Sequence, residues 1–227
     1  MKLPISDRLL ACASFVCPGD RIADIGCDHG YLSIHLLQSG VASSAICSDI
    51  RPQPLQSAIR NTEKYGLTDK MEFHLSDGVQ NIPRDFNTLI CAGMGADTMV
   101  SILDAAPWLK DRKYRIVLQC QSKTPMLRQY LSDNGYAISR ETVLKDGRFL
   151  YTVMEVVFAP DAPRLSPAAC YLPSILSGAE ADAYRNWVIG GLKIAAEHQH
   201  DAEKKKILKE LESLALPLGE LSADQAD

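Results

Sequence analysis

The sequence of 227 residues lacks any apolar run of the roughly 18 residues that a membrane-spanning helix needs. Its first 20 residues also lack the clean apolar core of a signal peptide, because Asp7 and Arg8 interrupt them and no small-residue cleavage site follows. We therefore expect a protein that neither enters a membrane nor is exported.

Paired cysteine spacing is missing as well. The seven cysteines are an odd number, and no two of them form a C-x-x-C pair. Several lie in apolar surroundings, which is typical of buried thiols in a reducing cytoplasm. The sequence accordingly predicts a cytoplasmic protein without a disulfide framework, and it shows no ligand spacing that would predict a metal site.

The chain has no overall positive charge, since its formal net charge is −4. Residues 105–150, however, hold nine basic and only four acidic side chains, and we call them the basic segment. Such a segment can guide a polyanion to the protein, but an ordinary solvated surface has the same composition. Charge alone leaves these two interpretations open.

A regular alternation of strands and helices fills the first two thirds of the chain. Short apolar runs at 21–26, 43–50, 70–77, 87–94 and 114–121 predict buried strands, and helical patterns follow four of them. Residues 136–147 and 148–159 predict a hairpin with "KDG" at its turn. The pattern indicates an α/β fold with a mainly parallel sheet, helices on both faces and an antiparallel edge strand.

A proline-rich stretch near residue 160 predicts a domain boundary. We expect a ligand-binding domain at 1–160 and a helical extension at 161–227. The extension fits two antiparallel helices, broken near Gly190-Gly191 or at His200-Asp201, or one long bent helix.

The turn after the first strand is the most informative stretch. It reads Asp24-Ile25-Gly26-Cys27-Asp28-His29-Gly30, with glycines where the chain must turn and approach a ligand closely. A dinucleotide-binding turn would read G-x-G-x-x-G, and the charge of Asp28 would repel a pyrophosphate. The pattern instead resembles the first motif of Rossmann-like methyltransferases that use S-adenosylmethionine (SAM), a cofactor with two cationic centres.

Other strand ends fit the same class. Asp49 ends the second strand, where a carboxylate can bind ribose hydroxyls, and Asp77 ends the third, where it could accept a bond from the adenine amine. "AGMGA" at 92–96 ends the fourth strand and is expected beside the cofactor. The predicted cofactor residues are Asp24, Gly26, Cys27, Gly30, Asp49, Ile50, Asp77, Gly78, Gly93, Met94 and Gly95.

A narrower resemblance covers residues 1–158. The stretches "SDRLLACASFVCPGDRIADIGCDHGYL", "SDI", "LSDG", "CAGMGA" and "LQCQSKTPMLRQYL" are similar to the bacterial tRNA (adenine(22)-N1)-methyltransferase family. The resemblance implies a seven-stranded Rossmann-like sheet, a helical, coiled-coil-like C-terminal extension, SAM as cofactor and tRNA as partner. Ala96 stands where the family often has glycine, and Cys120 where it often has proline, which affects the loop around Gln121 and Ser122.

The implied reaction is attack of adenine N1 on the SAM methyl carbon, which depends mainly on orientation. Asp28 is the catalytic candidate, because it could accept from the exocyclic amine; the alternative is that it only caps the next helix. His29 could orient Asp28, touch the substrate or only make a local bond at the start of the helix. The RNA candidates are Arg8, Lys123, Arg128 and Arg148.

Two other functions remain open from the sequence. One is a non-catalytic RNA-binding module on the same fold, and the other is a small-molecule SAM methyltransferase. Neither the fold nor the reaction requires an oligomer.

Overall fold

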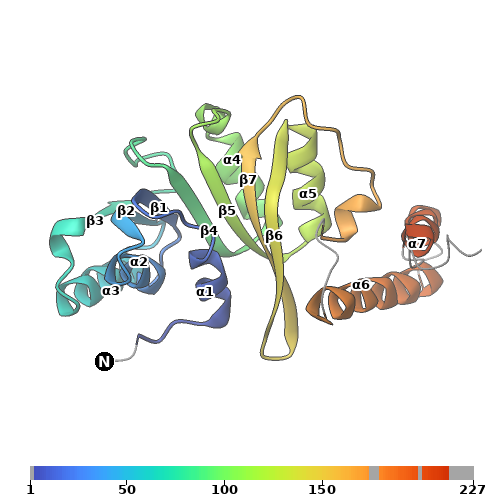
Figure 1. Ribbon diagram of the computed structural model, residues 1–227, viewed down its shortest axis with the longest axis horizontal. Helices are drawn as coiled ribbons and strands as arrows, with labels where there is room; N and C mark the ends of the chain where they lie inside the picture. The colour runs from blue at the N-terminus through green and yellow to red at the C-terminus, as the bar shows by residue number, and fades with distance from the viewer. Residues whose placement is uncertain (1–2, 174–178, 199–200, 215–227) are drawn as a thin grey trace, which may run out of the picture.

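The computed structural model describes residues 3–173, 179–198 and 201–214. Its centre is a seven-stranded sheet in the order β3-β2-β1-β4-β5-β7-β6 (Figure 1). The strands are β1 Asp20–Ile25, β2 Ala42–Asp49, β3 Met71–Leu75, β4 Thr88–Gly95, β5 Arg115–Ser122, β6 Tyr136–Asp146 and β7 Phe149–Phe158. The predicted α/β fold with seven strands is confirmed.

The first five strands run parallel to one another. β1 and β5 are buried over most of their length and β4 over its first half, as expected for parallel strands with helices on both faces. β7 pairs antiparallel with β5, and β6 with β7, so the hairpin supplies the antiparallel edge. The strand order reverses between β1 and β4, which is where open α/β sheets bind ligands.

Helices cover both faces of the sheet and enclose two apolar cores. The core on one face includes residues of α1 Asp7–Ala13, α2 Tyr31–Gln38 and α3 Pro52–Lys64. The core on the other includes residues of α4 Ala96–Asp104 and α5 Thr124–Asp133. Short 3₁₀ helices lie at Thr68–Lys70, Pro107–Leu109 and Ala169–Tyr171.

Ser6 caps α1 by accepting a hydrogen bond from the Leu9 amide at 3.5 Å. The helix ends at Ala13. The helix contacts the β6–β7 hairpin, which extends beyond the sheet between α1 and α6 Ala179–His198 (Figure 1). The N-terminal and C-terminal helices thus meet the same hairpin.

The C-terminal extension forms two helices, α6 and α7 Ala202–Leu214. α6 continues through Gly190 and Gly191, so of the two predicted breaks only the one near residue 200 occurs. A small apolar core holds this part together through Ala168, Leu172, Leu192, Ile207 and Leu211. The expected antiparallel pair is wrong, since Figure 1 shows α7 nearly end-on where α6 lies lengthwise. The division into two domains stays a prediction.

Candidate functional site

A cavity of about 490 Å³ lies at the carboxyl ends of β1, β2 and β4. Four stretches that follow strands line it, together with the start of α1 and two glutamines of β5. The predicted site residues that line it are Arg8, Asp24, Gly26, Cys27, Asp28, His29, Asp49, Ile50, Asp77, Gly78, Gly93 and Met94. The sequence motifs therefore converge on one site.

The turn after β1 forms the floor of this cavity. The Gly26 and Cys27 amides donate to the Ser48 carbonyl at 2.8 and 2.9 Å, which ties the turn to β2. Gly26 has φ +70°, and a Cβ there would overlap the Cε of Met94. Only glycine meets both constraints without a shift of its neighbours.

Asp28 also has a left-handed backbone, with φ +50°, which is uncommon for a residue that is not glycine. Its side chain is 60% exposed, and its Oδ2 lies 3.8 Å from Nε2 of His29. α2 is preceded by Gly30 as its N-cap residue and has no side-chain cap. The alternative that Asp28 caps the helix is therefore wrong, and the carboxylate is available to a ligand in the cavity.

Asp49 is the buried acid at the end of β2, only 5% exposed. Its Oδ1 accepts from the Arg51 amide at 2.9 Å, and its Oδ2 accepts from the Asp28 amide at 3.3 Å. These two bonds fix the carboxylate and leave lone pairs on both oxygens. A rigid acceptor of this kind suits a pair of vicinal hydroxyls.

Asp24, at the end of β1, is also buried and accepts a hydrogen bond from Ser33 Oγ at 2.8 Å. Burial raises the pKa of its carboxyl from 3.8 to about 6; the Ser33 bond lowers this pKa, and the nearby Asp49 raises it further. With Asp28 and Asp49, it makes the cavity acidic. This arrangement attracts cations and repels phosphates.

The turn after β3 and the last part of β4 also line the cavity. Gly93, within β4, has φ +78°, and its amide donates to Oε1 of Gln119 at 3.0 Å. Ile50, which follows β2, lines the cavity although its side chain is 61% exposed, so it offers an apolar cover to a ligand. This part of the lining combines backbone groups with an exposed apolar side chain, which suits a flat aromatic ring.

Two predicted cofactor residues do not line the cavity. Gly30 is the N-cap residue of α2, with φ +72°, where a Cβ would lie 3.2 Å from the Cβ of Ala58. Gly95 precedes α4, where a Cβ would lie 2.9 Å from Oγ of Ser122. Both glycines permit close packing behind the site rather than forming its surface.

Several lining residues were not predicted. Ser6, Leu9, Tyr31, Arg51, Ser76, Thr98 and Gln119 belong to this group. Gln119 carries a usable signal, because it is a fully buried amide within an apolar strand and such a group needs hydrogen-bond partners. The contribution of α1 has no sequence signal, since it depends on where the helix packs.

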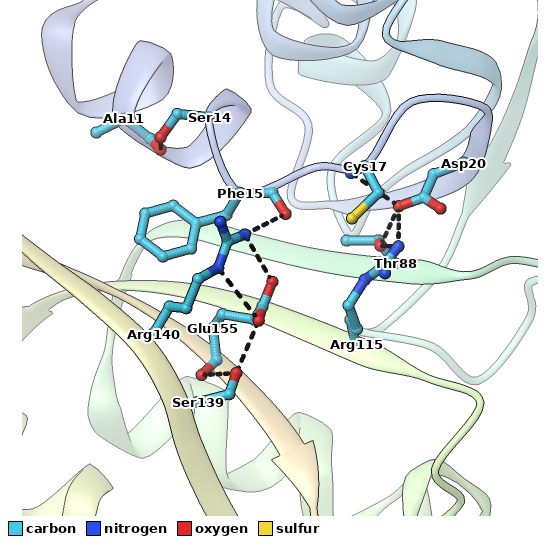
Figure 2. Close-up of polar contacts among 10 residues, drawn as sticks. All are labelled: Ala11, Ser14, Phe15, Cys17, Asp20, Thr88, Arg115, Ser139, Arg140 and Glu155. Atoms are coloured by element: carbon cyan, nitrogen blue, oxygen red, sulfur yellow. Dashed lines mark hydrogen bonds and ion pairs between the residues drawn. The ribbon is translucent and has the colours of Figure 1, made fainter.

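The basic segment is less basic in the structure than in the sequence. Arg115 bonds to Asp20 and Thr88, and Arg140 bonds to Glu155 at 2.9 Å (Figure 2). Carboxylates outside the basic segment therefore neutralise these guanidinium groups. Asp20 lies on β1 and Glu155 on β7, and a charge count over residues 105–150 includes neither of them.

The prediction that Arg128 contacts RNA is wrong. Its side chain is 1% exposed and forms a two-bond ion pair with the buried Glu141. A guanidinium in this position cannot reach a phosphate on the surface. Arg128 is instead part of the interior between α5 and β6.

The other RNA candidates are accessible, and their roles stay predictions. Arg8 lines the cavity, pairs with Asp146 at 2.6 Å and lies over the Tyr151 ring at 5.1 Å from its centroid. Lys123 is 60% exposed and pairs with Asp97 at 2.8 Å. Arg148 lies at the hairpin turn, over the ring of Phe149.

Metal and membrane features were searched in residues 3–173, 179–198 and 201–214. In these ranges no cluster of three or more His, Cys, Asp or Glu side chains could hold a metal ion. The same ranges contain no helix that is long and apolar enough to cross a bilayer.

Known proteins share both the sequence motifs and the fold. A tRNA (adenine(22)-N(1))-methyltransferase of Bacillus subtilis is 32% identical over 154 residues, which are 67% of this chain and 65% of that protein. This chain thus spans just under two thirds of that curated relative. The resemblance to this family is confirmed at the level of sequence similarity.

Two solved structures extend the similarity to the C-terminal helices. A Bacillus subtilis m1A22 tRNA methyltransferase has a TM-score of 0.79 at 27% identity, covering 94% of this chain and 96% of that one. A Streptococcus pneumoniae protein, provisionally named a tRNA (m1A22) methyltransferase, was solved with S-adenosyl-L-methionine. Its TM-score is 0.80 at 30% identity, covering 91% of this chain and 99% of that one.

A family model described as a methyltransferase domain matches residues 5–154, which contain every residue that lines the cavity. The match begins just before α1 and ends within β7. This chain belongs to the methyltransferase domain family.

Proposed function

We propose that this protein transfers a methyl group from SAM to N1 of adenine 22 in tRNA. The observation that carries the proposal is the acidic cavity at the β1–β4 crossover, in which Asp24, Asp28 and Asp49 surround a glycine turn. These carboxylates disfavour a dinucleotide and favour a cofactor with cationic centres. The similarity to tRNA methyltransferases supports the choice of substrate.

The residues of the cavity fit SAM by their chemistry. Asp49 would hold the ribose hydroxyls with its fixed carboxylate. Asp77 and the Gly93–Met94 backbone would border the adenine, and Ile50 would cover it. Asp24 and Asp28 would attract the ammonium and sulfonium groups. When bound, the cofactor supplies an activated methyl group.

Asp28 is our proposed catalytic residue. Adenine N1 already has a lone pair, so the reaction needs orientation more than a strong base. A carboxylate that accepts from the exocyclic amine would turn N1 toward the methyl group and stabilise the cationic product. Asp28 is suited to this, because its left-handed backbone holds an exposed carboxylate in the cavity. His29, 51% exposed beside it, would position the carboxylate.

The RNA has to deliver an unstacked base to this cavity, since N1 of a paired adenine is inaccessible. Arg8 is our candidate for a phosphate contact at the entrance, because it lines the cavity from α1. Lys123 and Arg148 would add contacts further out. We place the reaction in the cytoplasm, where unmodified tRNA is available.

Methyl transfer from labelled SAM to unmodified tRNA, followed by nucleoside analysis, tests the proposal. We expect 1-methyladenosine, and none when a tRNA with another base at position 22 is used. Label in metabolites but not in tRNA would favour a small-molecule enzyme. SAM binding without transfer to any acceptor would favour a non-catalytic module.

A variant separates the role of Asp28 from binding. Asp28→Asn should lower kcat by about 10- to 100-fold and lower SAM affinity by a smaller factor, because its bond to the exocyclic amine forms mainly in the transition state while its attraction to the cationic cofactor is already present in the bound state. The exposed acid Asp69 provides the matched control as Asp69→Asn. An unchanged kcat for Asp28→Asn would remove Asp28 from catalysis.

A further inference from the structure

A second cavity, of about 320 Å³, lies between the β5–α5 loop, β7 and α6. Its lining is unusually aromatic for a surface groove. We call it the aromatic groove and define it by Gln121, Lys123, Tyr151, Tyr171, Tyr184 and Trp187. The methyltransferase reaction proposed above does not use it.

Trp187 is the tryptophan that lines this groove. Its side chain is 61% exposed, although large aromatic side chains on a stable helix are usually covered. The indole packs on the ring of Tyr184, with centroids 5.7 Å apart, and Tyr184 is itself only 5% exposed. Trp187 is thus held at its edge by a buried neighbour and presents a rigid aromatic surface to solvent.

The aromatic groove borders the acidic cavity. Gln121 lines both of them, and its Nε2 lies 3.5 Å from the point where a Cβ on Gly93 would be. Arg8, which lines the cavity, lies over the ring of Tyr151, which lines the groove. One shared residue and one contact between lining residues therefore place the groove next to the cavity.

Two basic side chains, Lys123 and Arg8, lie where the groove borders the cavity, and each is paired with a carboxylate. Lys123 has a left-handed backbone, φ +58°, and it and Asp28 are the residues other than glycine with positive φ in the described ranges. Lys123 lies on the loop that lines the groove, and Asp28 lies on the loop that lines the cavity. The pair between Lys123 and Asp97 is exposed on both sides, 60% and 64%, so it is weak and Lys123 can exchange it for a phosphate.

We propose that the aromatic groove binds an unpaired nucleotide next to the methylated adenine. Its base stacks on Trp187, its phosphate contacts Lys123, and Gln121 lies between the two nucleotides. Stacking of a base on an aromatic side chain is independent of sequence and is common where proteins hold single-stranded nucleic acid. The groove would thereby keep the adenine unstacked at the cavity. This inference rests on the proposed tRNA substrate.

The first test compares two exposed apolar residues of α6. Trp187→Ala should weaken binding of unmodified tRNA about 10- to 100-fold, the range expected when one base is no longer stacked, and leave SAM affinity unchanged. Trp187→Phe should restore most of the affinity. Ile194→Ala is the matched control, since Ile194 is 60% exposed two turns further along α6 and lies outside the groove. Equal tRNA affinity of the Trp187→Ala and Ile194→Ala variants would overturn the proposal.

The second test measures stacking on Trp187 directly, by fluorescence. The chain has two tryptophans, and Trp108 packs against Phe86 and Tyr114 in another part of the molecule, so Trp108→Phe leaves Trp187 as the reporter. Unmodified tRNA should quench its fluorescence with the same Kd as binding. Binding without quenching would overturn the proposal, as would a change in self-association of Trp187→Ala with unchanged tRNA affinity.

The two proposals can fail separately. If the wild-type protein methylates tRNA but Trp187 is neither quenched nor needed, only the groove assignment fails. If single-stranded RNA quenches Trp187 while no tRNA is methylated, the groove assignment holds for RNA and the proposed reaction fails.

Discussion

The residues of the acidic cavity were predicted well from the sequence, whereas the positive charge of the basic segment was predicted poorly. In the cavity, most of the predicted site residues meet within about 490 Å³. In the basic segment, Arg128 is buried, while Arg115 and Arg140 bond to carboxylates of β1 and β7. One region keeps its predicted character, and the other loses much of its predicted charge.

The difference arises from how each signal is encoded. The cavity is built by short motifs at strand ends, and the carboxyl ends of parallel strands meet at one edge of a sheet whatever the rest of the chain does. Net charge is a sum over side chains, and it does not show which of them are buried or paired with carboxylates of other elements in the folded protein. A short motif at a strand end therefore predicts a site in the folded protein, whereas an excess of charge along the sequence does not predict a charged surface.

The largest expected effect comes from removing the buried guanidinium. Arg128→Met should lower the free energy of unfolding by about 3–5 kcal/mol, because it removes the two-bond partner of a carboxylate that has no solvent exposure. Chemical denaturation measures this change. SAM affinity of the folded variant should stay the same, since Arg128 lines no part of the acidic cavity.

Arg112→Met is the control within the same segment. Arg112 is 76% exposed and lies 3.9 Å from Asp161, which is 93% exposed, so its removal should change stability by less than about 1 kcal/mol. Similar destabilisation by both variants would mean that burial does not distinguish the arginines of the basic segment.

A smaller effect is expected at the buried acid of the cavity. Asp49→Ala should weaken SAM binding by about 1–3 kcal/mol, because ribose hydroxyls would lose their acceptor and the Asp28 and Arg51 amides would lose theirs. Titration calorimetry with SAM measures it, with the exposed Asp69→Ala as control. Tight NAD binding without SAM binding would contradict the assignment of this cavity.

Most of the fold could be predicted because parallel strands covered on both faces are apolar over most of their length. Residues 115–120 show this in β5, which is followed by a helix with Pro125 in its first turn. The continuation of α6 through Gly190 and Gly191 could not be predicted. Glycine raises the free energy of a helix only modestly, and packing of Leu192 against Ile207 and Leu211 offsets this cost.

Within the site, the type of residue was predictable and its exact role was not. Gly26 faces the cavity while Gly30 supports it from behind, although both have positive φ and belong to one motif. What separates them is their neighbours, Met94 on β4 and Ala58 on α3, which lie far away in sequence. Contacts of this kind become visible only when the strand order is known.

The pH dependence of SAM binding should report the buried Asp24. Its pKa of about 6 means that the cavity carries this negative charge above pH 6 and loses it below. Because SAM is cationic, its affinity should fall by roughly tenfold between pH 7 and pH 5. Calorimetry across this range measures the effect, and Asp24→Asn should flatten the profile.

Stability should respond to the same group in the opposite direction. Asp24 ionises near pH 3.8 in the unfolded chain but near pH 6 in the folded protein, so the folded protein binds more protons between these values. The free energy of unfolding should therefore decrease as pH rises from about 4 to 6, by up to roughly 3 kcal/mol from this group. In Asp24→Asn that contribution should be absent; its persistence would assign it to another group.

The smallest effect concerns the basic residues that remain accessible. The double variant Lys123→Glu with Arg148→Glu should weaken tRNA binding by about tenfold and reduce the slope of log K against log salt by about one for each phosphate that the variant no longer binds. The control reverses two other charges of the basic segment, Arg112→Glu with Lys113→Glu, which precede β5 at the edge of the sheet opposite the cavity. Both variants change the net charge equally, so a difference between their salt slopes measures position rather than charge. Equal slopes would mean that tRNA does not contact Lys123 or Arg148, and the phosphate contacts would have to be sought at Arg8.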